Sequence, residues 1–220
     1  MREVLTYARR GSRFSPAQAR AWERHHEAWV IPDEAVDADD FAWADWFGRE
    51  APLAVEIGSG VGEATAALAA RRPGTNVLAL EVWRPGVAET LGRLAEAGVD
   101  NVRLLGVDAV WTLEQLVAPG SVAELWTFFP DPWHKTKHHK RRLVAPGFAA
   151  LAADRLAPGG TWRLATDWQE YADRMREVLD AEPRLRGGVV ERWAERPLTK
   201  FERKGLAAGR TVTDLAYTRT

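Results

Sequence analysis

A carboxylate held between two prolines is the group in this chain that is best placed to do chemistry. Asp131 stands in the sequence Phe129-Pro130-Asp131-Pro132-Trp133, and each proline fixes its own φ and withholds an N–H group. A stiff loop therefore presents the carboxylate, and the flat ring of Trp133 beside it offers a face to a base. The alternative is structural, because Asp-Pro is common in turns and Trp133 could simply pack under the loop.

The segment after this loop is strongly basic. From His134 to Arg142 there are five Lys or Arg, three His and no acid, in a chain whose net charge is only -1. Beside an aromatic ring and a carboxylate, such a run favours contact with a nucleic acid backbone over a solvated helix face. His134 and His138 have i, i+4 spacing, but we discount a metal because the surrounding cations oppose one. The predicted phosphate contacts are Lys137, Lys140, Arg141 and Arg142.

A glycine-rich turn follows an apolar run nearer the start of the chain. Glu56-Ile57 leads into Gly58-Ser59-Gly60-Val61-Gly62, and glycines permit a tight turn and close approach to a ligand. The spacing is GxGxG, not the GxGxxG that seats the pyrophosphate of a nicotinamide cofactor on a helix N-terminus. Glu56 would repel that pyrophosphate, but it suits the cationic amino acid end of S-adenosylmethionine. The alternative is a glycine turn without a ligand.

Two more acids end the strands that we expect next along the chain. Glu81 comes 23 residues after Gly58, near the spacing of about 20 at which an acid binds ribose hydroxyls. Asp108 could accept a hydrogen bond from an adenine amino group, while Ala109 leaves room for the ring. The structural alternatives are a solvated carboxylate for Glu81 and a helix N-cap for Asp108. With Glu56, these acids lie at three successive strand ends, which favours a cofactor site.

An alternation of strands and helices must position these residues. Between Leu53 and Thr166, short Val- and Leu-rich runs alternate with Ala-rich stretches of helical length, which is typical of βαβ units. We therefore expect an α/β fold with a mostly parallel, doubly wound sheet, whose ligands bind at the carboxyl ends of the strands. The expected strands are 53–57, 76–81, 102–107, 123–129 and 161–166, with a turn at 158–160, and helices should begin near Glu63, Pro85, Val110, Pro146 and after Asp167.

Two later segments have the spacing of a helix capping box. In Thr166-Asp167-Trp168-Gln169-Glu170, Asp167 could cap a helix with Glu170 reaching back, and the stretch from Thr199 to Glu202 has the same spacing. The second is followed by glycines and no sustained apolar face. That context favours contact with a substrate over a purely structural helix start.

Composition restricts the class of protein. With 220 residues, 46% hydrophobic and 28% charged, the chain is expected to form one large globular domain, or one domain with an appendage. The absence of Cys excludes disulfides, thiolate metal sites and a Cys nucleophile. No apolar run approaches the roughly 20 residues of a membrane span, and the N-terminus lacks a secretory signal. We therefore expect an intracellular protein with no membrane contact.

The motifs together resemble a known family. The glycine turn after Glu56, the acids Glu81 and Asp108 and the Pro-Asp-Pro-Trp block with its basic tail look like those of the bacterial tRNA (guanine-N7)-methyltransferases. The resemblance runs almost end to end and includes the basic segment 9–18. Ser59 and Ser12 depart from it, since a bulkier residue and a glycine are usual at these positions. The matching motifs also include Asn101, Lys135, Thr166-Asp167 and Thr199-Lys200-Phe201-Glu202.

The resemblance implies a class I S-adenosylmethionine-dependent fold with a seven-stranded, Rossmann-like sheet. Residues 1–50 would form a basic arm and helices packed on a methyltransferase domain of residues 51–220. The enzyme would be cytoplasmic and a monomer or homodimer without an obligate protein partner, and it would methylate N7 of guanine 46 in the variable loop of tRNA. The implied cofactor positions are Glu56, Gly58, Gly60, Gly62, Glu81, Asp108, Ala109 and Asp131, with Asp131 also catalytic, and the implied tRNA positions are Lys135, Asp167, Thr199, Lys200, Phe201 and Glu202.

Guanine N7 carries a lone pair and no proton, so methyl transfer to it requires no general base. The expected role of Asp131 is to position the guanine or to stabilise the charge that develops on the ring. Two alternatives stay open. One is an exocyclic-amine RNA or DNA methyltransferase, which also places a short Asp-Pro-aromatic loop after the fourth strand. The other is a tRNA-binding module without catalytic activity.

Overall fold

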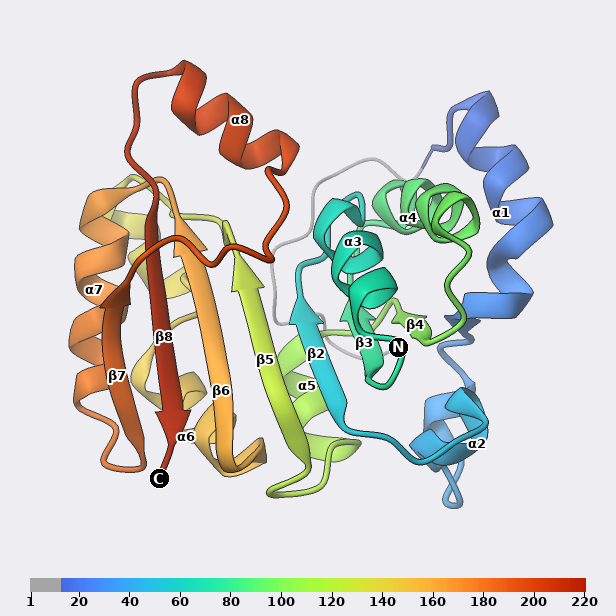
Figure 1. Cartoon of the computed structure of the whole chain (residues 1–220), viewed down its shortest axis with the longest axis horizontal. Helices are drawn as coiled ribbons and strands as arrows, with labels where there is room; N and C mark the ends of the chain where they lie inside the picture. The colour runs from blue at the N-terminus through green and yellow to red at the C-terminus, as the bar shows by residue number, and fades with distance from the viewer. Residues whose placement is uncertain (1–12) are drawn as a thin grey trace. The chain divides into compact units, whose positions relative to one another are not determined.

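The computed structural model of this chain describes residues 13–220. Ser12 and the first part of the basic segment 9–18 lie outside the described residues. The chain forms two compact units that divide between Leu116 and Val117. Each unit contributes four strands to the described part of the fold (Figure 1).

The first unit is built on parallel strands. Every residue of its two longest strands is buried, as expected for a parallel sheet that is covered on both faces. Helices α3 (Glu63–Arg71), α4 (Arg84–Ala97) and α5 (Ala109–Gln115) follow successive strands, which confirms the βαβ prediction. The strands lie in the order β1 (Val30–Ile31), β4 (Val102–Leu105), β3 (Asn76–Leu80) and β2 (Leu53–Ile57).

Short signals set where these helices begin and end. Gly62 is the N-cap of α3 in a left-handed conformation, Pro85 occupies the first turn of α4, and Asp108 caps α5. The buried side chain of Asn101 donates to the carbonyls of Ala69, Arg72 and Thr75. It therefore closes the C-terminal end of α3, where carbonyls lack helical partners.

The segment before β2 packs on the same unit. Helix α1 (Pro16–Trp29) begins with a capping box between Ser15 and Gln18, and Trp29 Nε1 donates to Val99 O at 3.0 Å. After the short helix η1 (Ala35–Asp37), α2 (Trp43–Phe47) is tied to the core by Trp43 Nε1, which donates to Leu116 O at 2.8 Å. The expected domain boundary at residue 50 stays a prediction.

The second unit combines one parallel and two antiparallel strand pairs. Strand β6 pairs with β5 in parallel and with β8 in antiparallel orientation, and β8 pairs with β7. Figure 1 shows α7 running beside these strands and α8 beyond their upper ends. The strands are β5 (Val122–Phe128), β6 (Leu156–Thr166), β7 (Leu185–Val190) and β8 (Thr213–Arg219), and the helices are η2 (Thr136–Arg141), α6 (Pro146–Arg155), α7 (Gln169–Asp180) and α8 (Lys200–Ala207).

Most predicted elements are confirmed, with differences at their ends. Strand β4 ends at Leu105 rather than 107, and β6 begins at Leu156 rather than 161. The predicted turn at 158–160 is an irregularity inside β6, because the register to β5 jumps there and Gly159 has φ +78°. The two-residue β1 accounts for the eighth strand beyond the expected seven. The α/β class with mostly parallel strands is therefore confirmed.

The helix predicted after Asp167 is confirmed as α7, and its inner face buries Tyr171, Met175, Val178 and Leu179. Trp168 lies just before the helix as its N-cap. Within residues 13–220, no helix combines the length and the hydropathy that crossing a membrane requires.

Candidate functional site

The glycine turn of the first unit has a backbone that only glycine adopts without strain. Gly58, Gly60 and Gly62 have φ of 71°, 61° and 74°, in the left-handed region. A Cβ at Gly62 would lie 2.4 Å from the side chain of Thr90, and one at Gly86 would lie 2.3 Å from Gly60 O. The glycines therefore let α4 pack directly against the turn.

Glu81 fixes this turn from the end of β3. Its Oε2 accepts from Gly60 N at 2.7 Å, and its Oε1 accepts from Trp83 N at 2.8 Å. The predicted ribose contact stays a prediction, and the structure adds a positioning role that the sequence pattern did not indicate.

Glu56 is a buried carboxyl at the end of β2. It is 3% exposed and accepts from Thr65 Oγ1 at 2.5 Å. Burial raises its pKa to about 7, against the lowering effect of the Thr65 hydrogen bond and with a further rise from the negative charge of Glu81. The carboxyl therefore titrates near neutral pH. An ammonium group placed against it would favour its ionised form.

Asp108 is the N-cap of α5, and its Oδ1 accepts from Val110 N at 2.9 Å and Trp111 N at 3.1 Å. This confirms the structural interpretation of Asp108. The adenine contact of Asp108 and the space left by Ala109 stay predictions. Ala109 is the first residue of the helix and is buried.

In the second unit, the loop that carries Asp131 is tightly bent. Phe129 and Trp133 have φ of 52° and 47°, and within residues 13–220 no other non-glycine residue has a positive φ. Such residues cost about 1–3 kcal/mol each and persist only where their surroundings hold them. Phe129 N donates to Ala165 O at 2.7 Å. The carboxylate of Asp131 is exposed between the two strained positions.

The basic segment forms the 3-10 helix η2, with Lys135 as its N-cap. Lys135, Lys137 and Lys140 are exposed, so their predicted phosphate or tRNA contacts are sterically open. The guanidinium of Arg141 lies 5.0 Å from the centre of the Trp133 ring. One face of that ring is therefore already in contact with a cation.

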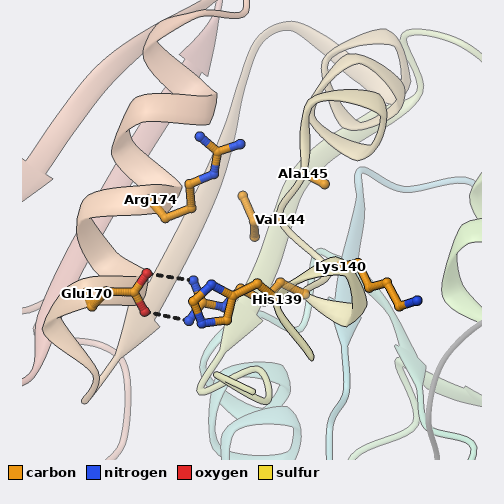
Figure 2. A pocket seen from close by; sticks show the side chains of 7 residues that line it. His139, Lys140, Val144, Ala145, Glu170 and Arg174 are labelled. Atoms are coloured by element: carbon orange, nitrogen blue, oxygen red, sulfur yellow. Dashed lines mark hydrogen bonds and ion pairs between the residues drawn. The ribbon is translucent and has the colours of Figure 1, made fainter. Parts of the chain in front are cut away.

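Arg142 differs from the other cations because it is buried. Its Nε donates to Pro132 O at 2.8 Å, and its two terminal nitrogens donate to the carboxylate oxygens of Glu170 at 2.9 and 2.5 Å. Both residues line a pocket of about 320 Å³, and Figure 2 shows Glu170 there together with His139, Lys140 and Arg174. The guanidinium that was predicted to bind phosphate is thus already bound to protein oxygens.

The structure brings two predicted tRNA-site segments together. Asp167 Oδ2 accepts from Arg210 Nε at 2.8 Å, and a Cβ at Gly205 of α8 would lie 2.6 Å from the same oxygen. Helix α8 therefore contacts Asp167 at a position where only glycine fits. The capping role of Asp167 is wrong, because Trp168 is the N-cap of α7.

The segment from Thr199 to Glu202 has two kinds of residue. Thr199 caps α8, and its Oγ1 accepts from Glu202 N at 3.3 Å, which confirms the capping interpretation for its hydroxyl. Lys200 is exposed, as is the side chain of Phe201 at 42%. Glu202 is only 1% exposed. Lys200 and Phe201 are therefore the members of this motif that present a surface to a substrate.

Sequence reasoning missed Arg196, which holds Glu202 in place. Its fully buried guanidinium donates to Glu202 Oε2 at 2.5 Å and to Asp214 Oδ2 at 2.9 Å. Arg192 also donates to Glu202, at 2.7 Å. Burial opposes ionisation of Glu202, but Arg192 and Arg196 outweigh it and hold its pKa below the ordinary value. No local spacing signals this cluster, because Asp214 lies 18 residues from Arg196.

The same arginine reaches the Asp131 loop. Its guanidinium carbon lies 5.6 Å from the ring centre of Phe128 and 5.4 Å from that of Phe129. Phe129 is one of the two strained residues of the loop. Arg196 therefore packs on the end of β5 while it binds the first turn of α8.

Comparison with known proteins gives consistent matches along the chain. A family model described as "Putative methyltransferase" matches residues 50–215. A tRNA (guanine-N(7)-)-methyltransferase from a Nocardioides species is 70% identical over 219 residues, which cover 100% of this chain and 88% of that protein. The protein of the same name from Cutibacterium acnes is 46% identical over 232 residues, which cover 99% and 84%.

Solved structures match at the level of fold. The 16S rRNA methyltransferase KamB has a TM-score of 0.58 at 18% identity, covering 83% of this chain and 95% of that one. A 16S rRNA (adenine(1408)-N(1))-methyltransferase variant, solved with its cosubstrate S-adenosylmethionine, has a TM-score of 0.54 at 15% identity, covering 81% and 90%.

Proposed function

The chain belongs to the tRNA (guanine-N(7)-)-methyltransferase family, and from this membership we propose that it transfers a methyl group from S-adenosylmethionine to N7 of guanine 46 in the variable loop of tRNA. The observation that carries the proposal is the 70% identity to a relative of that name, which extends over the whole chain. The chain therefore shares both units with that relative. We further infer that the enzyme works in the cytoplasm, where tRNA is modified.

The first unit is proposed to hold the methyl donor. S-adenosylmethionine supplies an electrophilic methyl group on a sulfonium and carries a cationic amino acid end. The buried carboxyl of Glu56 suits that ammonium group, and Glu81, at the end of the next strand, is proposed to accept hydrogen bonds from the ribose hydroxyls. Asp108 and Ala109 are proposed to meet the adenine. The backbone of the glycine turn at Gly58, Gly60 and Gly62 would lie against the donor because no side chains intervene.

Asp131 is proposed to act on the guanine and on the donor by charge and position. Guanine N7 attacks with a lone pair, so no proton must be removed from it. The purine gains positive charge as the methyl group arrives, and a carboxylate nearby lowers the energy of that state. The same carboxylate could accept hydrogen bonds from the N1 and N2 donors of guanine, which would aim N7 at the methyl group.

The second unit is proposed to hold the tRNA. Lys135, Lys137, Lys140 and Arg141 carry the positive charge that phosphates attract. Asp167 and the exposed residues of the Thr199 to Glu202 segment would meet the nucleotides nearer the target. In this proposal Thr199 and Glu202 hold α8 in position, while Lys200 and Phe201 contact the tRNA.

The test is to incubate the protein with S-adenosylmethionine and unmodified tRNA, digest the RNA and identify the methylated nucleoside by mass spectrometry. We expect 7-methylguanosine at position 46, and a tRNA with another base at that position should accept no methyl group. A methylated exocyclic amine would replace the proposal with the alternative enzyme class. Binding of tRNA without any product would favour the module without catalytic activity.

A further inference from the structure

Arg142 joins two segments that both carry predicted site residues. Through Nε it binds the carbonyl of Pro132, the residue directly after Asp131. Through its terminal nitrogens it binds Glu170, in the first turn of α7 and three residues after Asp167. One side chain therefore connects the Asp131 loop to the start of α7.

We propose that Arg142 is a positioning residue for Asp131, acting with Glu170 as a latch, and that it does not contact phosphate. This inference rests on the proposed function, since it assigns a role within that reaction. We call the pair of Arg142 and Glu170 the latch.

Burial and charge support the latch. The side chain of Arg142 is 4% exposed, whereas that of Glu170 is 55% exposed. A buried guanidinium needs a counter-ion and bonded N–H groups, and the two-oxygen contact with Glu170 supplies both. The hydrogen bond from Arg142 lowers the pKa of Glu170, against a smaller opposing effect of burial. A phosphate that approached the terminal nitrogens of Arg142 would compete with the carboxylate of Glu170, which is already bound there.

The surroundings hold the latch from a second side. The guanidinium carbon of Arg142 lies 4.7 Å from the ring centre of Tyr171, and Tyr171 Oη accepts from Val144 N at 3.2 Å. Burial raises the pKa of Tyr171 to about 12, so its hydroxyl stays protonated at neutral pH. Glu170 and Tyr171 of α7 therefore bind Arg142 and Val144, the residues on either side of Leu143.

The consequence concerns the geometry of Asp131. The bond to Pro132 O closes the segment from Pro132 to Arg142 into a ring, from which Lys135, Lys137 and Lys140 project as exposed cations. The Asp131 loop is strained at Phe129 and Trp133, so it needs such restraints to keep its shape. A displacement of about 1 Å in a catalytic group can cost on the order of 100-fold in rate.

The latch and a phosphate contact predict different effects of the substitution Glu170→Gln on kcat and on tRNA affinity. If Arg142 positions Asp131, then Glu170→Gln weakens the same restraint and lowers kcat. If Arg142 binds phosphate, then Glu170→Gln removes a competing negative charge and raises tRNA affinity. Glu177→Gln is the matched control, because Glu177 lies on the same helix, changes the net charge equally and pairs with the exposed Arg174.

The experiment measures kcat, KM for tRNA and the salt dependence of tRNA binding for Arg142→Gln, Glu170→Gln, the double variant and Glu177→Gln. We expect kcat to fall by about tenfold or more in both latch variants, with KM and the salt slope changed less than twofold. The double variant should be no slower than Arg142→Gln alone. Arg142→Lys, which keeps the charge but loses the two-pronged geometry, should restore little of kcat.

Lys140→Gln gives the contrasting pattern, since loss of an exposed cation should raise KM and reduce the salt slope by about one contact. If Arg142→Gln behaves like Lys140→Gln and Glu170→Gln binds tRNA more tightly, the latch is overturned. If the unaltered protein methylates no tRNA, the proposed function fails by itself. The latch is then tested by urea unfolding of the unaltered protein, Arg142→Gln, Glu170→Gln and the double variant. Additive effects of the two substitutions on the free energy of unfolding would refute it.

Discussion

In the proposed reaction, the guanine N7 that accepts the methyl group already has a lone pair, so Asp131 would not need to remove a proton. Its neighbours fix where the carboxylate lies, through two prolines and two strained residues. For the proposed reaction, such a fixed charge is worth more than a mobile one, because no reorganisation is needed as the purine becomes positive.

Asp131→Asn tests this role at the smallest scale. The substitution keeps the shape but removes the charge, so we expect kcat to fall on the order of 100-fold or more, as when one preorganised electrostatic contact is lost. Single-turnover methylation of tRNA measures this, with S-adenosylmethionine affinity measured alongside. Wild-type turnover in the variant would rule out both the positioning and the charge role.

Glu56 gives a prediction for pH. Its pKa is raised to about 7, so below that pH the folded protein holds it neutral and cofactor binding must ionise it. We expect S-adenosylmethionine affinity to rise as pH increases from about 6 to about 7.5, below the range where an α-amino group loses its proton. Calorimetric titration should show this rise, and Glu56→Gln should bind more weakly with a flat profile.

The raised pKa of Glu56 also affects stability, but here the expected trend with pH is opposite to that of cofactor affinity. A raised pKa means that folding favours the protonated carboxyl, so Glu56 costs stability as pH rises from its unfolded value near 4.5 to about 7. Glu56→Gln should remove this cost, which is about 3 kcal/mol when the carboxyl is fully ionised. Urea unfolding above neutral pH would measure the gain, and a less stable Gln variant would contradict it.

At the scale of elements, the second unit is organised around charges that only the fold brings together. The loop at Arg196 binds the first turn of α8 through Glu202 and strand β8 through Asp214. The neighbouring Arg192 also donates to Glu202, so two guanidinium groups balance the two carboxylates. A buried ionic cluster, and not an apolar core, therefore holds α8 in place.

Arg196→Met should destabilise the protein strongly, because it leaves Glu202 and Asp214 buried with half of their positive charge. Breaking a buried ion pair from one side costs about 3–5 kcal/mol, and urea unfolding would measure it. Arg192→Met is the control, since Arg192 is 40% exposed and water can replace part of its contact. Equal losses in the two variants would show that burial of the guanidinium is not what matters.

Gly205→Ala tests the contact between α8 and Asp167. In an open helix position such as Gly92, which has no atom within 4 Å of a built Cβ, alanine should stabilise by up to about 1 kcal/mol. At Gly205 the added carbon would lie 2.6 Å from Asp167 Oδ2, so α8 or Asp167 must move. We expect KM for tRNA to rise in Gly205→Ala and not in Gly92→Ala, and an unchanged KM would separate α8 from tRNA binding.

For the whole molecule, charge distribution matters more than total charge. The net charge of -1 gives no general attraction to RNA, whereas η2 and its flanks concentrate exposed lysines on one segment. We expect tRNA affinity to fall steeply with salt, with a log–log slope of roughly -3 if Lys135, Lys137, Lys140 and Arg141 each neutralise a phosphate. Fluorescence anisotropy at several salt concentrations measures this slope, and a flat profile would remove the phosphate role from the segment.

Much of the architecture follows from local pattern. Strands β2 and β3 lie where buried Val- and Leu-rich runs predict them, and α3 and α6 begin at the predicted residues. These features depend on contacts within a few residues, since periodicity, proline and glycine act locally. The ends of β4 and β6 were less predictable, because pairing with another strand decides where a strand stops.

The sequence by itself determined the α/β alternation, the glycine turn, the family and the residue types that are proposed to do the chemistry. Tertiary structure alone decided which charged side chains are exposed to a substrate and which are bound inside the protein. The reason is that a pKa or an ion pair depends on groups distant along the chain. Arg142 and Lys140 are both cations of one basic run, yet burial against Glu170 and Pro132 removes Arg142 from solvent while Lys140 stays exposed. Likewise Glu202 belongs to a surface motif by spacing, but Arg196 and Arg192 hold it inside the protein.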